Sequence, residues 1–132
     1  MASIDFVNKD MGVLIVDDHM STRDLIRAIL RSAGFSNLYL AENGKIALET
    51  LNREKIGLII CDWNMPILNG LETLKLVRED PRHANMPFIM LTAEAYKESI
   101  VAAVQARVSD YVAKPFTAEI LLAKIAKVFA RI

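Results

Sequence analysis

The chain has 132 residues, 53% of them hydrophobic and 24% charged, which is the composition of one globular domain rather than of a disordered segment. Its 16 basic and 16 acidic residues give a net charge of zero, which argues against the broad positive surface of a nucleic-acid-binding protein. No apolar run is long enough to cross a membrane, and residues 1–11 lack the apolar core of a signal peptide, so we expect a cytoplasmic protein.

Five short apolar runs rich in β-branched and aromatic residues predict buried strands. The runs are apolar throughout rather than alternating, which is typical of strands in a parallel sheet that is covered on both faces. After a leader over residues 1–11, the predicted strands span, in chain order, residues 13–16, 37–41, 58–61, 87–91 and 110–113.

Apolar residues at helical spacing predict a helix after each strand. Asn43, Asn69 and Thr117 stand where a side chain can cap a helix, and Gly34 stands where a helix can end. With their caps included, the predicted helices span residues 21–33, 43–54, 69–80, 94–106 and 117–131. The side chains expected to face the sheet are Leu25, Ile26, Ile29, Leu30, Ala33, Ala47, Leu48, Leu51, Leu71, Leu74, Val77, Ile100, Val101, Val104, Leu121, Ile125, Val128 and Phe129.

Strict alternation of strands and helices predicts a doubly wound α/β fold, with a five-stranded parallel sheet and helices on both faces. Right-handed crossovers make the strand order 2-1-3-4-5 the usual arrangement at this size, which is the flavodoxin-like topology. We expect residues 1–132 to form a single domain without an attached effector domain. In such sheets the ligand lies at the carboxyl ends of the strands, so the residues that follow each strand are the candidate site.

Five polar side chains follow four of the predicted strands. Asp17 and Asp18 follow the first strand, Asp62 the third, Thr92 the fourth and Lys114 the fifth. Three crowded carboxylates require a cation, and hard oxygen ligands suit Mg²⁺ or Mn²⁺. An ammonium and a hydroxyl beside a metal ion are the partners that a transferring phosphoryl group needs. The pattern predicts a phosphoryl-transfer site with Asp62 as the nucleophile.

Each of these residues also has an ordinary structural explanation, because acid pairs after a strand are common in turns and helix caps. Their gathering at the ligand-binding edge of the predicted sheet, with nothing comparable at the opposite edge, favours a functional site. His19 follows the acid pair, but the other donors are all oxygen, and we do not expect it to be a ligand.

Four motifs at matching intervals carry a resemblance to a known family. They are Val16-Asp17-Asp18, Asp62-Trp63-Asn64-Met65-Pro66, Leu91-Thr92-Ala93-Glu94 and Tyr111-Val112-Ala113-Lys114-Pro115-Phe116. From about Met11 to Arg131 the chain resembles the receiver domain of bacterial two-component signalling. Within that family it is most similar to the stand-alone chemotaxis response regulators.

The resemblance implies a phosphorylation cycle on the chain itself. Asp62 would accept a phosphoryl group from a phosphohistidine of a sensor histidine kinase. Asp18, Asp62 and the backbone carbonyl of Asn64 would bind Mg²⁺, with Asp17 acting through water. Lys114 would contact the phosphoryl group.

The resemblance also implies a switch that controls a downstream protein, either a flagellar motor switch or another target. Thr92 would move toward the phosphoryl group, and Tyr111 would follow by turning inward. Asn64 and Glu94 would tune the lifetime of the acyl phosphate. The bond between Lys114 and its following proline would be cis.

Three departures from the family pattern fall on the expected output face, which also contains Tyr111. Arg107 and Asp110 replace usual glycines, so the helix before them must find another stop or strain a non-glycine residue. Tyr96 replaces a familiar lysine. We expect these changes to affect the choice of partner more than the chemistry.

Two other functions were weighed against the switch. An aspartyl-phosphate phosphohydrolase also uses an aspartate at a strand end, but it needs a second acid two residues later, where this chain has Asn64. The receiver half of a DNA-binding regulator would need a helix-turn-helix, and no such motif follows the last helix. We therefore expect a monomeric switch without catalytic turnover on other molecules, and with no nucleic-acid or membrane partner.

Overall fold

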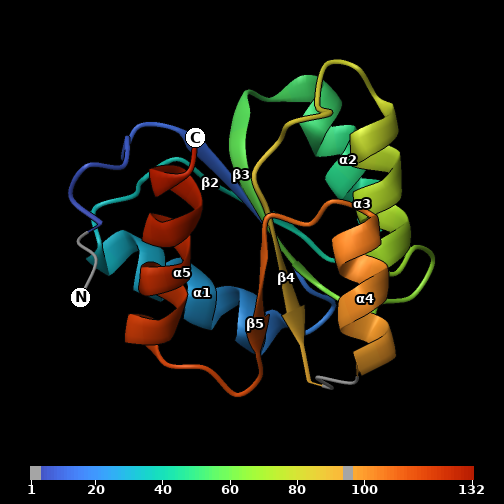
Figure 1. Ribbon diagram of the computed structural model, residues 1–132. Coiled ribbons are helices and arrows are strands. Elements are labelled where there is room, and N and C mark those ends of the chain that lie inside the picture. Colours follow the sequence, from blue (N-terminus) through green and yellow to red (C-terminus); the bar gives the residue numbers. More distant parts are fainter. Residues whose placement is uncertain (1–3, 94–96) are drawn as a thin grey trace.

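One parallel sheet runs through the protein, which is represented by a computed structural model that describes residues 4–93 and 97–132. The strand order is β2-β1-β3-β4-β5, as the sequence predicts (Figure 1). The strands are β1 (Gly12–Val16), β2 (Leu38–Ala41), β3 (Ile56–Asp62), β4 (Phe88–Thr92) and β5 (Asp110–Ala113). The helices are α1 (Met20–Ser32), α2 (Gly44–Arg53), α3 (Gly70–Glu79), α4 (Lys97–Gln105) and α5 (Ala118–Ala130).

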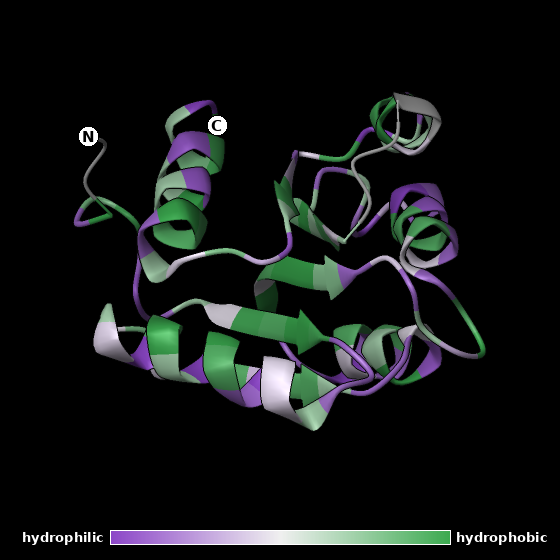
Figure 2. Cartoon of the chain, turned by 90° about the horizontal axis from the view of Figure 1, so that it is seen from below, coloured by the Kyte–Doolittle hydropathy of each residue, from purple (hydrophilic) through white to green (hydrophobic). Residues whose placement is uncertain are grey.

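Helices cover the sheet on both faces, with α1 and α5 on one side and α2, α3 and α4 on the other (Figure 1). Side chains of a strand alternate between these two layers. In β1, Val13 and Ile15 join the core beneath α1 and α5, while Leu14 and Val16 join the opposite core. Figure 2 shows the continuous hydrophobic colour that results along the central strands. No helix in the described ranges is long and apolar enough to span a membrane.

The predicted helix caps are present. The Asn43 side chain accepts a hydrogen bond from the backbone nitrogen of Ile46 at 2.9 Å. Asn69 and Glu72 form a reciprocal capping box, with the two bonds at 2.8 and 3.0 Å. Thr117 caps α5 in the same way as Asn43 caps α2. These caps fix where α2, α3 and α5 begin, so the loops at the candidate site have defined ends.

Three side chains predicted to face the sheet are instead exposed to solvent. Leu25 is 51% exposed on α1, and Val101 and Val104 are 44% and 60% exposed on α4. The prediction for these residues was wrong because each helix meets the sheet along a narrower stripe than its apolar face. Among the α4 side chains that the structure describes, the buried one is the small Ala103, which lies between the two exposed valines in sequence.

The first residues of the chain were expected to be a leader, but the described part of this segment packs on the core. Val7 is 5% exposed, and Ile4 contacts the cluster beneath α1 and α5. The Lys9 ammonium donates to the backbone carbonyls of Ile4 and Val7 at 2.6 and 3.1 Å, and it lies 5.3 Å from the centre of the Phe35 ring. The segment therefore covers one end of the core near α1.

The turn after helix α4 contains a residue in the left-handed conformation, which is one of the two outcomes expected where the usual glycine is missing. Arg107 has a φ of 65°. Its backbone nitrogen donates to the carbonyl of Val104 at 2.9 Å, and that of Val108 donates to the carbonyl of Ala103 at 3.0 Å. The Arg107 carbonyl in turn accepts a hydrogen bond from Nε of Arg78 at 3.0 Å. The turn is thus well bonded but carries backbone strain at Arg107.

We predict that Arg107→Gly stabilises the protein by about 0.5–1 kcal/mol. The left-handed conformation costs a non-glycine residue about 1–2 kcal/mol, and glycine avoids this cost. Glycine also gives the unfolded chain more conformational freedom, which cancels part of the gain in stability. Arg107→Ala is the matched control, because it also removes the positive charge facing Arg78 but keeps the strain. Urea unfolding should therefore place the glycine variant above the alanine variant, and equal stability of the two variants would contradict the strain.

Candidate functional site

The register of the sheet brings two predicted acidic residues together at one edge. Strands β1 and β3 pair so that Val16 lies opposite Cys61. The next residues are Asp17, which follows β1, and Asp62, the last residue of β3, so the two lie side by side at the carboxyl ends of the strands. Both are buried, with Asp17 at 0% and Asp62 at 5% exposure.

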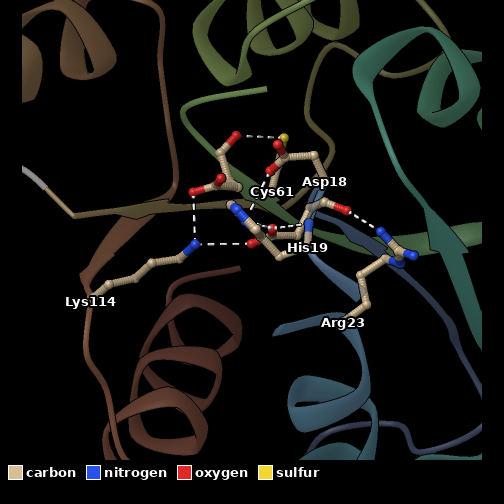
Figure 3. Close-up of polar contacts among 7 residues, drawn as sticks. Asp18, His19, Arg23, Cys61 and Lys114 are labelled. Atoms are coloured by element: carbon tan, nitrogen blue, oxygen red, sulfur yellow. Dashed lines mark hydrogen bonds and ion pairs between the residues drawn. The ribbon is translucent and has the colours of Figure 1, made fainter. Parts of the chain in front are cut away.

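Lys114 bridges these two carboxylates from the end of β5. Its Nζ lies 2.9 Å from Oδ2 of Asp17 and 3.0 Å from Oδ1 of Asp62 (Figure 3). The Lys114 side chain is 20% exposed, so the ammonium is largely withdrawn from solvent. Residues from the first, third and fifth strands thus meet in one hydrogen-bonded group, as the sequence predicts.

Burial and ion pairing act in opposite directions on the pKa values of this group. Burial raises the pKa of Asp62 and the charge of Asp17 raises it further, while the hydrogen bond from Lys114 lowers it. For Lys114, burial lowers the pKa, but the hydrogen bonds to Asp17 and Asp62 outweigh burial and the net shift is upward. The ion pairs favour the charged form of both partners, yet for Asp62 burial prevails. Two buried carboxylates thus share a single ammonium, and like charges this close together favour an additional cation.

Asp18 and His19 complete the cluster on its solvent side. The ligand atoms of Asp17, Asp18, His19 and Asp62 all lie within 4.8 Å of one another. Asp18 is 30% exposed in its side chain, so the cluster opens toward solvent. Three carboxylates in a partly open site are a donor set that fits a divalent cation with bound water. The predicted metal ligands Asp17, Asp18 and Asp62 are thus brought together.

Two residues at the site were not predicted from the sequence. His19 Nδ1 lies 3.2 Å from Oδ1 of Asp17 and 3.1 Å from Oδ1 of Asp18. Nη1 of Arg23 donates to the backbone carbonyl of Asp17 at 2.7 Å, holding the end of β1 against the first turn of α1. In the sequence, Arg23, Arg27 and Arg31 recur at helical spacing, and nothing in that pattern indicates this contact.

The loop after Asp62 is closed by backbone hydrogen bonds. The nitrogen of Trp63 donates to the carbonyl of Leu91 at 2.9 Å, and the nitrogen of Gly70 donates to the carbonyl of Trp63 at 2.7 Å. A Cβ atom on Gly70 would collide with the backbone carbonyl of Asp62. Glycine therefore lets α3 start directly beside the site. Asn64 lies within this closed loop and is exposed.

Thr92 ends β4, and two of the predicted output residues, Asp110 and Tyr111, lie on β5. Thr92 is 5% exposed at the carboxyl end of β4. Tyr111, on the neighbouring strand, is partly buried, and Nζ of Lys124 lies 5.3 Å from the centre of its ring. Asp110 forms ion pairs with Lys124 and Arg131, each at 3.2 Å. Asp110 therefore joins β5 to α5, a contact that glycine could not make.

Two further sequence predictions, Glu94 and Tyr96, fall outside the described residues. The bond between Lys114 and Pro115 is cis, as the resemblance implies.

Mg²⁺ is expected to change the fluorescence of Trp63. This residue directly follows Asp62, and its partly buried ring contacts the core beneath α2 and α3. A cation that draws the carboxylates together should alter the ring's surroundings. A fluorescence titration measures the effect, and Asp18→Ala should shift it to higher Mg²⁺ concentration. An unchanged spectrum of the wild-type protein at saturating Mg²⁺ would contradict a metal site here.

Comparisons with known proteins agree with this geometry. Residues 13–126 match the response regulator receiver domain family. Chemotaxis protein CheY-3 of Vibrio cholerae is 41% identical over 126 residues, which cover 96% of this chain and 97% of that protein. The structure of chemotaxis protein CheY4 of the same species matches with a TM-score of 0.85 and 32% identity, over 90% of this chain and 98% of that one.

A further similar structure is the receiver domain of sensor histidine kinase PA1611 from Pseudomonas aeruginosa PAO1. It was solved with a magnesium ion coordinated in its active site cleft. It matches with a TM-score of 0.79 and 30% identity, over 89% of this chain and 95% of that one.

Proposed function

Because the chain belongs to the response regulator receiver family, we propose that it is a phosphorylation-activated signalling switch that acts in chemotaxis. One observation supports this assignment above the others, namely that Lys114 bridges Asp17 and Asp62 beside an acidic cluster open to solvent. No observation favours a phosphohydrolase or a fragment of a DNA-binding regulator.

Asp62 is the proposed phosphoacceptor. A carboxylate oxygen of Asp62 attacks the phosphorus of a phosphohistidine on a sensor histidine kinase, the phosphorus–nitrogen bond breaks, and the imidazole leaves with a proton from solvent. The product is an acyl phosphate on Asp62. In this proposal, the Lys114 ammonium neutralises the phosphoryl oxygens, and the Thr92 hydroxyl moves toward them.

Mg²⁺ is the proposed cofactor, with Mn²⁺ as an alternative. Asp18, Asp62 and the backbone carbonyl of Asn64 would hold the ion directly, and Asp17 through water. The ion would supply positive charge that offsets repulsion between the carboxylates and the incoming phosphoryl group. The oxygen donors of the cluster support this proposal, and so does the magnesium ion of the PA1611 receiver domain.

A groove beside Lys114 supports access for the phosphoryl donor. It has a volume of about 400 Å³, and the exposed Leu25 of α1 forms part of its wall. The groove is lined by Thr22, Leu25, Ala93, Lys114, Pro115 and Phe116. A phosphohistidine domain that docks here would present its imidazole next to the ammonium of Lys114.

The proposed output surface comprises Tyr96, Arg107, Asp110 and Tyr111. A downstream protein, such as a flagellar motor switch, would bind here once the phosphoryl group has altered Thr92 and Tyr111. Asn64 and Glu94 are proposed to tune how long the acyl phosphate survives. The protein then works once per cycle on itself and performs no turnover on other molecules.

The deciding experiment incubates the protein with Mg²⁺ and a small acyl-phosphate donor, followed by intact mass spectrometry. We expect a gain of one phosphoryl group, which is lost in mild base, as acyl phosphates are. Omission of Mg²⁺ should reduce the modification strongly. An unmodified wild-type protein under these conditions would refute the proposal.

Thr92→Ala is predicted to uncouple phosphorylation from output. Asp62 and Lys114 remain in place, so the variant should still gain the phosphoryl group from a small donor. Without the hydroxyl, the phosphoryl group cannot draw Thr92 toward it, and the rotamer of Tyr111 should no longer respond. Fluorescence of a Tyr111→Trp reporter, with and without the donor, measures this response. A full fluorescence response in the variant that combines Thr92→Ala with Tyr111→Trp would show that Thr92 does not connect the phosphoryl group to residue 111.

A further inference from the structure

His19 occupies a position at the acidic cluster that an all-oxygen site does not require. It is the residue before α1, and its backbone nitrogen donates to Oδ1 of Asp17 at 2.9 Å. Its ring lies over the cluster, as the close-up in Figure 3 shows. The His19 side chain is 67% exposed, so its position owes little to packing in the core.

The positions of the donor atoms fit a shared ion. Nδ1 of His19 lies 3.2 Å from Oδ1 of Asp17 and 3.1 Å from Oδ1 of Asp18. Two adjacent ligands of an octahedral ion, with bonds of about 2.1 Å at right angles, lie about 3.0 Å apart. The imidazole nitrogen can therefore bind the same ion as Asp18 with little movement of the side chains, while Asp17 contacts that ion through water, as proposed above.

The chemistry of the donor atoms indicates which metal ions bind more tightly when this imidazole nitrogen is a ligand. Mg²⁺ prefers oxygen ligands and holds its water tightly, so an imidazole adds little to its binding. Imidazole suits the first-row transition metals, whose affinities for nitrogen and oxygen sites rise from Mn²⁺ through Co²⁺ to Ni²⁺. A site with three carboxylates and one imidazole thus differs from a magnesium site in its selectivity.

We propose that His19 is a metal ligand, and that it makes this site bind transition-metal dications such as Ni²⁺, Co²⁺ and Zn²⁺ more tightly than Mg²⁺. The inference rests on the proposed function in one respect, because it takes Asp17, Asp18 and Asp62 as the metal site of the switch. The ligand atom is Nδ1, which requires the neutral ring to carry its proton on Nε2. Replacement of the imidazole should matter most for Ni²⁺ and least for Mn²⁺.

The chain offers a matched control, because it has only two histidines, His19 and His83. The metal-free wild-type protein, His19→Gln and His83→Gln are titrated with Ni²⁺ and with Mg²⁺ by calorimetry and Trp63 fluorescence. We expect His19→Gln to raise the Kd for Ni²⁺ at least tenfold and to change the Kd for Mg²⁺ less than twofold. His83→Gln should leave both constants unchanged.

A second measurement needs no variant and tests the ligand directly. Zn²⁺ added to wild-type protein labelled with ¹⁵N should shift the Nδ1 resonance of His19 and leave that of His83 in place. An unchanged His19 resonance at saturating Zn²⁺, or equal Ni²⁺ affinity of the wild-type protein and His19→Gln, would overturn the inference. A hydrogen bond from His19 to Asp17 without metal binding produces that result.

The same preparations separate this inference from the proposed function. Each protein is incubated with Mg²⁺ and a small acyl-phosphate donor, and its mass is measured. Phosphorylation of the wild-type protein together with His19-independent Ni²⁺ binding would overturn the role of His19 alone. Failure of the wild-type protein to become phosphorylated, with His19-dependent Ni²⁺ binding intact, would refute the proposed function and leave the metal ligand standing.

Discussion

Asp62→Asn is expected to abolish phosphorylation by a small acyl-phosphate donor. The amide oxygen of asparagine is a weak nucleophile. In the described cluster, the other buried carboxylate that pairs with Lys114 is that of Asp17. Asp17 is fully buried, so a phosphoryl donor cannot reach it as it reaches Asp62. Intact mass spectrometry should show no gain of a phosphoryl group, whereas the wild-type protein becomes modified.

The same substitution should stabilise the metal-free protein at neutral pH, by about 1 kcal/mol. Burial and the charge of Asp17 raise the pKa of Asp62 above its ordinary value of 3.8. An acid whose pKa is higher in the folded state lowers stability as the pH rises from 3.8 through the folded value. Asp62→Asn removes this penalty and leaves Lys114 paired with one buried carboxylate, so the gain should be present at neutral pH and absent below about pH 3.8.

Asp24→Asn is the control for both measurements. Asp24 is an exposed acid on α1 whose carboxylate pairs with Arg27 at 3.1 Å on the surface. This variant should still be phosphorylated, and its stability should lie within about 0.5 kcal/mol of the wild-type protein. A destabilised Asp62→Asn in the absence of metal would contradict a net penalty for the charged Asp62 carboxylate in the folded protein.

Lys114→Met is expected to destabilise the metal-free protein by about 3 kcal/mol at neutral pH. It leaves the carboxylates of Asp17 and Asp62 buried together without their cation, and removal of one partner from a buried pair costs about 3–5 kcal/mol. We take the lower end of that range because the Lys114 side chain is 20% exposed. Urea unfolding measures the loss.

The pH dependence of the Lys114→Met effect distinguishes charge from packing. The pKa of Lys114 is raised, so its contribution to stability is present below its ordinary value of 10.5 and is lost as the pH rises through the folded value. Toward acid, protonation of Asp62 removes the charge that Lys114 balances. The destabilisation should therefore shrink at both ends of the pH range. A loss that is constant with pH would indicate packing of the lysine stem instead.

Lys124→Met provides the comparison for a lysine in a less buried ion pair. Lys124 is 30% exposed and lies 3.2 Å from Asp110, which keeps a second partner in Arg131. Its removal should cost no more than about 1 kcal/mol. Equal losses for the two lysine variants would contradict a special role of burial at Lys114.

The layout of the site was predictable because it depends on strand ends. Apolar runs that stop at Asp17, Asp62, Thr92 and Lys114 place these residues at one edge of any parallel sheet with the predicted order. The contacts of His19 and Arg23 were not predictable in the same way. They arise from the angle at which α1 leaves β1, and helical periodicity does not specify that angle.

Side-chain exposure on the helices was predicted less well than the helices themselves. An apolar residue at helical spacing, such as Leu25 or Val104, satisfies the pattern whether or not the sheet reaches it. The strain at Arg107 is one of the two outcomes that the missing glycine predicted, the other being a different helix stop. The local backbone conformation was thus predicted more reliably from the sequence than the buried face of each helix.

The hydrogen-bonded ladder of the sheet continues one residue past the strands at this site. The amides of Asp17, Trp63 and Lys114 donate to carbonyls on adjacent segments, at 3.1, 2.9 and 2.8 Å respectively. Exchange of these amide hydrogens with solvent therefore requires the edge that holds the carboxylates to open. An ion or phosphoryl group bound there would oppose that opening, so the exchange rates of three backbone amides should report the signalling state of the protein.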